Sequence, residues 1–172
     1  MSRLHMDHQR KNSPISTVAG MGMLLAFALI LSYVESLIPF SFGIPGIKLG
    51  LANLAVVVGL YLIGTKEAFL VDFTRILLAG FLFGNLYSIL YSLAGGMGSF
   101  LVMALSKRSN AFSVKGVSMA GGVSHNAAQL AVAALVVETG SILYYFPALL
   151  VAGLLTGFLI GVIAEQVERR TI

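Results

Sequence analysis

Apolar residues are gathered into six long runs that are separated by short polar breaks. The runs cover about residues 17–38, 51–63, 67–83, 86–105, 116–137 and 142–164. A helix needs about 20 mainly apolar residues to cross a bilayer, and most of these runs approach that length. The breaks hold residues typical of turns, such as the Gly- and Pro-rich stretch 39–50 and the pair Gly84-Asn85. The pattern predicts an all-α, polytopic membrane protein with six transmembrane helices.

The six runs form one domain between two polar ends. We expect an N-terminal tail over residues 1–16, a six-helix transmembrane domain over 17–165 and a C-terminal tail over 166–172. The first run is too long for the apolar core of a signal peptide, and no Ala-x-Ala cleavage site ends it. We therefore interpret it as the first membrane helix.

Composition supports this interpretation and narrows the function. Hydrophobic residues make up 58% of the chain and charged residues only 10%, against about 25% charged in a soluble domain. A separate catalytic domain has no room in such a chain. The sequence has neither an HExxH motif nor an Asp-rich pair to hold a metal for hydrolysis or prenyl transfer. We expect a protein that is not an enzyme and has no metal or cofactor.

The cations predict the orientation of the helices. With the N-terminus inside, nine of the 11 Lys and Arg residues lie in cytoplasmic segments. These nine are Arg3, Arg10, Lys11, Lys66, Lys107, Arg108, Lys115, Arg169 and Arg170. Lys48 alone lies outside, and Arg75 falls within a span. Because cytoplasmic loops carry the excess of cations, we expect a multi-pass protein of the cytoplasmic membrane with both termini in the cytoplasm. This distribution explains the net charge of +4 without a nucleic-acid partner.

Polar residues inside the predicted spans are the candidates for function, because they are costly in hydrocarbon. Asp72 and Arg75 are three residues apart and share one helix face. They are either an internal ion pair that fixes helix packing or a ligand site in which Asp72 orients Arg75. His125, Asn126 and Gln129 form a polar stripe on another helix, where helix packing is the alternative to ligand binding.

The first outer loop adds two further candidates. Lys48 lies in the loop and Asn53 just beyond it, while Glu35 lies near the outer end of the first span. We predict a ligand site in the outer half of the membrane that is roofed by residues 39–50. Its residues are Lys48, Asn53, Arg75, His125, Asn126 and Gln129. The excess of positive charge favours an anionic ligand.

Small residues mark two helix surfaces for close approach. Gly153, Gly157 and Gly161 recur every fourth residue in the last span, and Gly22 and Ala26 have the same spacing in the first. Such spacing lets backbones approach closely, either within the protein or against a partner subunit.

Four segments together closely resemble the Gx transporter family, whose members are often labelled heptaprenyl diphosphate synthase component I. The segments are GIPGIKLGLANL (43–54), FTRILLAGFLFG (73–84), YSLAGGMGSFLVMAL (91–105) and GGVSHNAAQLAVA (121–133). The family is related to the S components of energy-coupling factor (ECF) transporters, which are six-helix proteins that bind a vitamin-like molecule. The resemblance implies an S-component-like fold and, as partners, a transmembrane coupling subunit and two ATPase subunits. The S-component pattern has Ala-x-x-x-Ala on its first helix, where this chain has Gly22-x-x-x-Ala26.

Two functions follow from the residues and the resemblance together. The first is a membrane-embedded substrate-binding subunit for uptake of a small, anionic or vitamin- or quinone-precursor-like molecule, with ATP hydrolysed by the partner subunits. The second is a membrane accessory of isoprenoid or quinone biosynthesis, or of flavin-linked electron transfer, that transports nothing. A self-sufficient carrier is disfavoured, because the sequence shows no internal repeat.

Cysteine labelling tests the predicted orientation, because the native chain contains no Cys. A membrane-impermeant thiol reagent applied to intact cells should label the variant Ser41→Cys and spare Ser109→Cys. Permeabilised cells provide the control, since both variants should then react. If only Ser109→Cys were labelled in intact cells, the protein would have the opposite orientation in the membrane.

Overall fold

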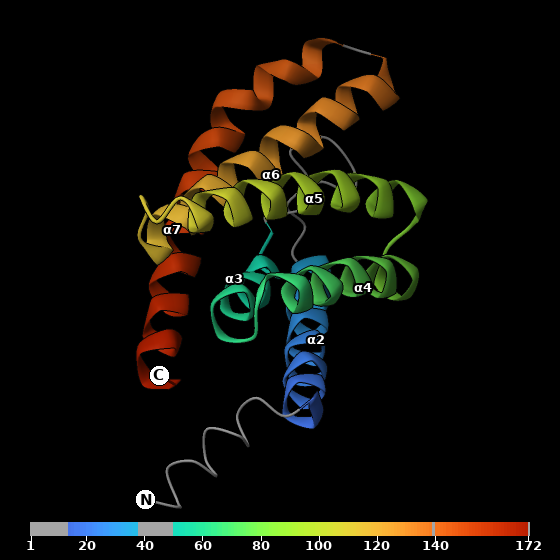
Figure 1. The fold of residues 1–172 in the computed structure, drawn as a ribbon. Helices are drawn as coiled ribbons and strands as arrows, with labels where there is room; N and C mark the ends of the chain where they lie inside the picture. The colour runs from blue at the N-terminus through green and yellow to red at the C-terminus, as the bar shows by residue number, and fades with distance from the viewer. Residues whose placement is uncertain (1–13, 38–49, 139, 172) are drawn as a thin grey trace, which may run out of the picture.

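A computed structural model describes residues 14–37, 50–138 and 140–171 of the chain, and this part is entirely helical (Figure 1). The elements are α2 (Pro14–Leu37), α3 (Asn53–Leu62), α4 (Thr65–Phe83), α5 (Leu86–Arg108), α6 (Val114–Val137), the 3₁₀ helix η1 (Gly140–Tyr145) and α7 (Phe146–Thr171). Six α-helices therefore follow one another in the predicted order, and the all-α prediction is confirmed.

The ends of several helices differ from the prediction, and two of these differences bear on the fold. α3 begins at Asn53 and has only 10 residues. α7 continues to Thr171, through most of the predicted C-terminal tail. The extension is stabilised on its own surface, because Arg169 Nη2 donates to Glu165 Oε1 at 3.0 Å, one turn away. Thr171 also donates from its hydroxyl to the carbonyl oxygen of Val167 at 2.8 Å.

The helices pack in a chain of neighbours. α6 lies between α5 and α7, α4 contacts α2, α3 and α5, and α3 contacts α2, α4 and α7. Figure 1 shows α6 and α7 running alongside each other and α5 lying over α4. The main apolar cluster lies around α3, whose Val56, Val57 and Leu60 are almost completely buried. The short helix α3 is therefore part of the core.

Length and composition agree with a membrane location. Of the described helices, α2, α5, α6 and α7 with its preceding turn are long and apolar enough to cross a membrane. Large apolar side chains cover the outside, for example Phe81 and Leu86, which are 77% and 78% exposed. Since a water-soluble domain buries such residues, this surface fits lipid.

The other two helices, α3 and α4, bear on the prediction that all six helices cross the membrane. With 10 residues, α3 is about 15 Å long and covers about half of the hydrocarbon core. α4 has 19 residues, which suffices in length, but it carries Lys66, Glu67, Asp72 and Arg75. Six helices are thus present, and α3 is too short to cross the membrane unaided.

Several of the predicted cytoplasmic cations gather at one end of the helices. Lys107 Nζ, near the end of α5, donates to the carbonyl oxygen of Leu60, near the end of α3, at 2.5 Å. Lys115, in the first turn of α6, pairs with Glu165 of α7 at 3.0 Å. The C-terminal ends of α3 and α5 are therefore in contact, and the N-terminal end of α6 contacts the C-terminal part of α7.

The glycines of α7 face α6 inside the protein. A Cβ atom on Gly157 would lie 2.7 Å from the carbonyl oxygen of Ser118, and one on Gly153 would lie 2.7 Å from that of Gly122. A Cβ on Gly161 would meet the Cα of Lys115 at the same distance. All three close contacts are with backbone atoms, so the spacing serves intramolecular packing. In contrast, a Cβ on Gly22 of α2 would have nothing within 4 Å.

The variant Gly157→Leu should therefore lower stability strongly. Overpacking typically costs about 1–3 kcal/mol, and we expect about 3 kcal/mol here because backbone atoms cannot rotate away. Thermal unfolding in detergent measures the loss. Gly22→Leu is the matched control, and its melting temperature should stay close to that of the wild type. Equal melting temperatures for both variants would contradict the α6–α7 contact.

Candidate functional site, a buried polar cluster

Polar side chains from three helices meet in the interior of the protein. We call Asn53 of α3, Asp72 and Arg75 of α4, and His125 and Gln129 of α6 the polar cluster. Each of these five residues is at most 5% exposed. Polar groups inside membrane helices are rare and costly, so their concentration at one place marks the candidate site.

Asp72 and Arg75 form the ion pair at the base of the cluster. Arg75 donates to Asp72 Oδ1 from Nε at 3.0 Å and from Nη2 at 2.5 Å. The pair lies one helix turn apart on α4, and its side chains are 1% and 4% exposed. Desolvating either charge alone would be expensive, and the short contact offsets this cost. The charge of Arg75 is thus compensated within the protein.

Asn53 links this ion pair to His125. Arg75 Nη2 donates to Asn53 Oδ1 at 3.5 Å, and Asn53 Nδ2 lies 3.4 Å from His125 Nδ1. Because Arg has donors only, it orients the Asn53 oxygen towards itself and the Asn53 NH₂ group towards His125. Nδ1 of His125 must then accept, which places the proton of the neutral imidazole on Nε2.

Gly95 of α5 makes space for two members of the cluster. A Cβ atom at this position would lie 2.7 Å from Gln129 Cγ and 2.9 Å from His125 Cε1. Any larger residue would displace one or both side chains. The glycine therefore lets α5 pass directly beneath His125 and Gln129 and places them side by side.

Glu35 of α2 holds the chain where it enters α3. Its Oε1 accepts hydrogen bonds from the backbone nitrogens of Gly50 at 2.5 Å and Leu51 at 3.3 Å. Gly50 has a φ of 81°, a conformation that glycine adopts readily, and a Cβ there would lie 3.5 Å from His125 Nε2. The entrance to α3 therefore adjoins the side of His125 that carries the proton.

Gln129 differs from the other members because the described residues leave its amide unused. The side chain is 0% exposed, and neither Nε2 nor Oε1 has a hydrogen-bond partner in residues 14–37, 50–138 and 140–171. Buried amides are normally hydrogen-bonded. Gln129 is thus the part of the cluster with capacity for a further group.

The structure brings together four of the six predicted ligand residues, namely Asn53, Arg75, His125 and Gln129. Asn126 lies elsewhere, since its Nδ2 donates to the carbonyl oxygen of Leu149 on α7 at 2.7 Å. Its amide thereby bridges α6 and α7, which is the packing role. Lys48 and most of the predicted roof lie outside the described residues.

Gly95 is not among the site residues predicted from the sequence. The adjacent pair Gly95-Gly96 in an apolar helix was the available signal. Among the residues that the structure describes, no group of three or more His, Cys, Asp and Glu side chains could hold a metal ion.

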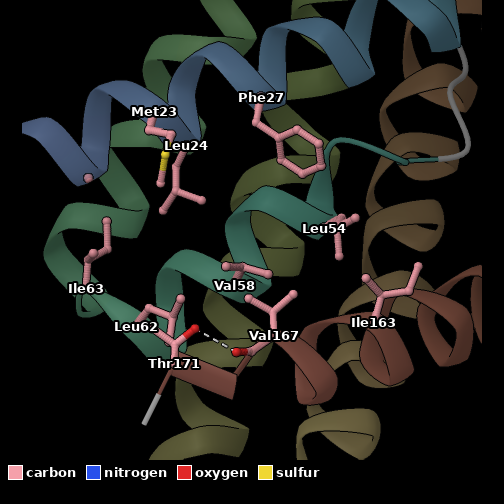
Figure 2. Close-up of a pocket in the computed structure, with 11 residues that line it drawn as sticks. Met23, Leu24, Phe27, Leu54, Val58, Leu62, Ile63, Ile163, Val167 and Thr171 are labelled. Carbon is pink, nitrogen blue, oxygen red and sulfur yellow. Dashed lines mark hydrogen bonds between the residues drawn. The ribbon is translucent and has the colours of Figure 1, made fainter. Parts of the chain in front are cut away.

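A hollow lies apart from the polar cluster, between α2, α3 and α7, and its lining is almost entirely apolar. This groove has a volume of about 460 Å³, and Figure 2 shows the side chains that line it. Its lining includes Phe27 of α2, Val58 of α3 and Ile163 of α7. The hydroxyl of Thr171, at its edge, already donates to the carbonyl oxygen of Val167. The rest of the described lining offers hydrocarbon contact, so we place the candidate site at the polar cluster.

Comparison with known proteins identifies the family. The sequence profile of the family heptaprenyl diphosphate synthase component I matches residues 24–167, which is most of the chain. The chain belongs to this family. The matched range includes every member of the polar cluster. No curated protein and no solved structure matches the chain.

Replacing Arg75 by an uncharged residue tests whether its ion pair with Asp72 stabilises the protein. Arg75→Gln should destabilise the protein by about 3–5 kcal/mol, because it leaves the Asp72 carboxylate buried and unpaired. The double variant Asp72→Asn/Arg75→Gln removes both charges and should recover most of that loss. Thermal unfolding of the single and double variants measures the difference. Equal losses in Arg75→Gln and in the double variant would contradict the importance of the pair.

Proposed function

We propose that this protein is the membrane-embedded, substrate-binding subunit of an uptake system for a small molecule. In this proposal it lies in the cytoplasmic membrane with both termini in the cytoplasm. A transmembrane coupling subunit and two ATPase subunits drive transport, and this chain has no catalytic role. The observation that carries the proposal is the polar cluster, in particular the buried amide of Gln129 beside His125.

The energetic cost of the cluster supports a binding role. A lone ion pair between Asp72 and Arg75 could serve helix packing alone, since each charge has its partner. His125 reaches that pair only through Asn53, and the Gln129 amide makes no hydrogen bond to the described residues, so an apolar residue could fill the position of Gln129. Intramembrane polar groups beyond the need of packing are expected where a substrate binds.

The charges constrain the ligand. Arg75 is already paired with Asp72, so it is not a free counter-ion for an anionic substrate. The expectation of an anionic ligand therefore depends on Lys48, which lies outside the described residues. The proposal accordingly specifies a small vitamin-like or quinone-precursor-like molecule, and an anionic group on it is an expectation from the sequence alone.

Surface exposure indicates where a coupling subunit would dock. Gly22 and Ala26 lie on an exposed face of α2, with open space around Gly22. The ridge of Gly153, Gly157 and Gly161 is already occupied by α6. Of the two small-residue surfaces, the one on α2 is thus available to a partner helix.

A second function is favoured by the family name. Heptaprenyl diphosphate synthase component I denotes a part of an isoprenoid-forming system. The alternative proposal is therefore a membrane accessory of isoprenoid or quinone biosynthesis, or of flavin-linked electron transfer, that moves no substrate. In that role the polar cluster would bind no transported molecule, and the exposed face of α2 would contact a biosynthetic or redox protein.

Purification from native membranes separates the two functions. Native mass spectrometry should show one small molecule per chain, and the coupling and ATPase subunits should co-purify. His125→Ala should lower occupancy by this molecule about 30-fold or more, because a buried polar contact is lost. Ser124→Ala is the matched control, since its hydroxyl bonds only to the carbonyl oxygens of Ala120 and Gly121 on its own helix. An empty protein that co-purifies with a biosynthetic or redox enzyme would support the alternative.

A further inference from the structure

The amide of Gln129 carries information about the chemical class of the ligand. It is 0% exposed, and both its donor and its acceptor lack partners among the described residues. A buried amide that makes no hydrogen bond has lost its water without compensation. A methionine would fill a similar volume without this penalty. A ligand group that hydrogen-bonds to both the NH₂ group and the oxygen of the amide would therefore account for a glutamine at this position.

The other unpartnered buried side chains among the described residues do not make the same case. Ser32, Ser99 and Ser118 also have hydroxyls without a partner there. A serine hydroxyl in a helix can rotate to a carbonyl of its own preceding turn, so a small movement satisfies it. The Gln129 amide has two opposite requirements in one plane, an acceptor for its NH₂ and a donor for its oxygen. Its own helix cannot meet both.

The surroundings of Gln129 favour an uncharged partner. Arg75 is bonded to Asp72, and Glu35 accepts from the backbone nitrogens of Gly50 and Leu51. His125, which shares the space above Gly95 with Gln129, accepts at Nδ1 from Asn53 and is neutral in that arrangement. A group that meets Gln129 therefore has no free opposite charge beside it among the described residues.

We propose that Gln129 recognises a ring edge on which an N–H donor stands beside a C=O acceptor, as in a lactam or a cyclic imide. This inference rests on the proposed function. The amide oxygen of Gln129 would accept from the ring N–H, and its NH₂ group would donate to the ring carbonyl. Both bonds form in one plane, so neither end of the amide is left unpaired.

Two other ligand classes fit Gln129 less well. A quinone ring has carbonyl acceptors only, so it could bond the Gln129 NH₂ group but would leave the oxygen buried and unpaired. A carboxylate has the same deficiency and adds a negative charge. The donor–acceptor edge thus favours a nitrogen heterocycle over a quinone as the ligand of this part of the site.

A pair of probes and a pair of variants test the inference on the full-length protein in detergent. Uracil has the proposed edge, whereas N,N′-dimethyluracil has the same ring and carbonyls but no N–H. Saturation-transfer NMR measures the binding of each probe. The variants are Gln129→Met, which removes the amide, and Ser118→Ala, which removes a buried unpartnered hydroxyl at the α6–α7 contact, outside the polar cluster.

We expect uracil to bind the wild type and Ser118→Ala alike, and to bind Gln129→Met about 10- to 100-fold more weakly. Dimethyluracil should bind none of them. Without ligand, the melting temperature of Gln129→Met should be unchanged or raised by about 2–4 °C, because an unpaired buried amide has been removed. This gain of stability with loss of binding is not expected of a structural residue.

Several results would overturn the inference. These are equal binding of the two probes, no binding of uracil to the wild type, unchanged binding of uracil to Gln129→Met, or a lowered melting temperature of that variant. An endogenous ligand without a donor–acceptor edge would also refute the inference and leave the proposed function intact. Absence of any co-purified small molecule would count against the proposed function, while uracil binding that depends on Gln129 would still support the assignment of its amide.

Discussion

The contact between Asp72 and Arg75 is the constraint on which the interior of this protein depends. An unpaired charge in the middle of a membrane helix is expensive, so the two residues must stay together. Their pairing in turn fixes the direction of Asn53, because Arg75 can only donate, and Asn53 fixes the tautomer of His125. One ion pair on α4 thereby sets the hydrogen-bonding polarity of side chains on α3 and α6.

The pattern of hydrophobic residues was sufficient to predict the helices and insufficient to predict where they end. Runs of apolar residues correctly predicted six helices in order, because burial and lipid exposure both require such runs. The end of α7 was misjudged, since the charges after Ala164 resemble a solvated tail. In the structure Glu165 and Arg169 pair across one turn, and Lys115 pairs with the same glutamate. Such pairing prolongs a helix beyond its apolar part, and periodicity of apolar residues does not report it.

The site was predictable as a set of residue types and not as a set of contacts. His125 and Gln129 are one turn apart and share a face, whereas Asn126 lies about 100° further around the helix. Both faces of α6 meet a glycine-bearing helix, α5 on one side and α7 on the other. The sequence could not tell which neighbour covers which face, so Asn126 was grouped with residues from which the structure separates it. Only the packing of α6 against both neighbours assigns it to α7.

The shortness of α3 affects how the protein keeps protons and small ions from crossing the membrane. In the proposed orientation, the described chain approaches α3 at Gly50 and Leu51, whose backbone nitrogens donate to Oε1 of Glu35. A solute from the outer side would then need to traverse only part of the membrane to meet Asn53. Beyond it stand Val56, Val57 and Leu60, all at most 1% exposed. These apolar side chains have a low dielectric constant, so protons and small ions that reach Asn53 meet a steep electrostatic barrier there.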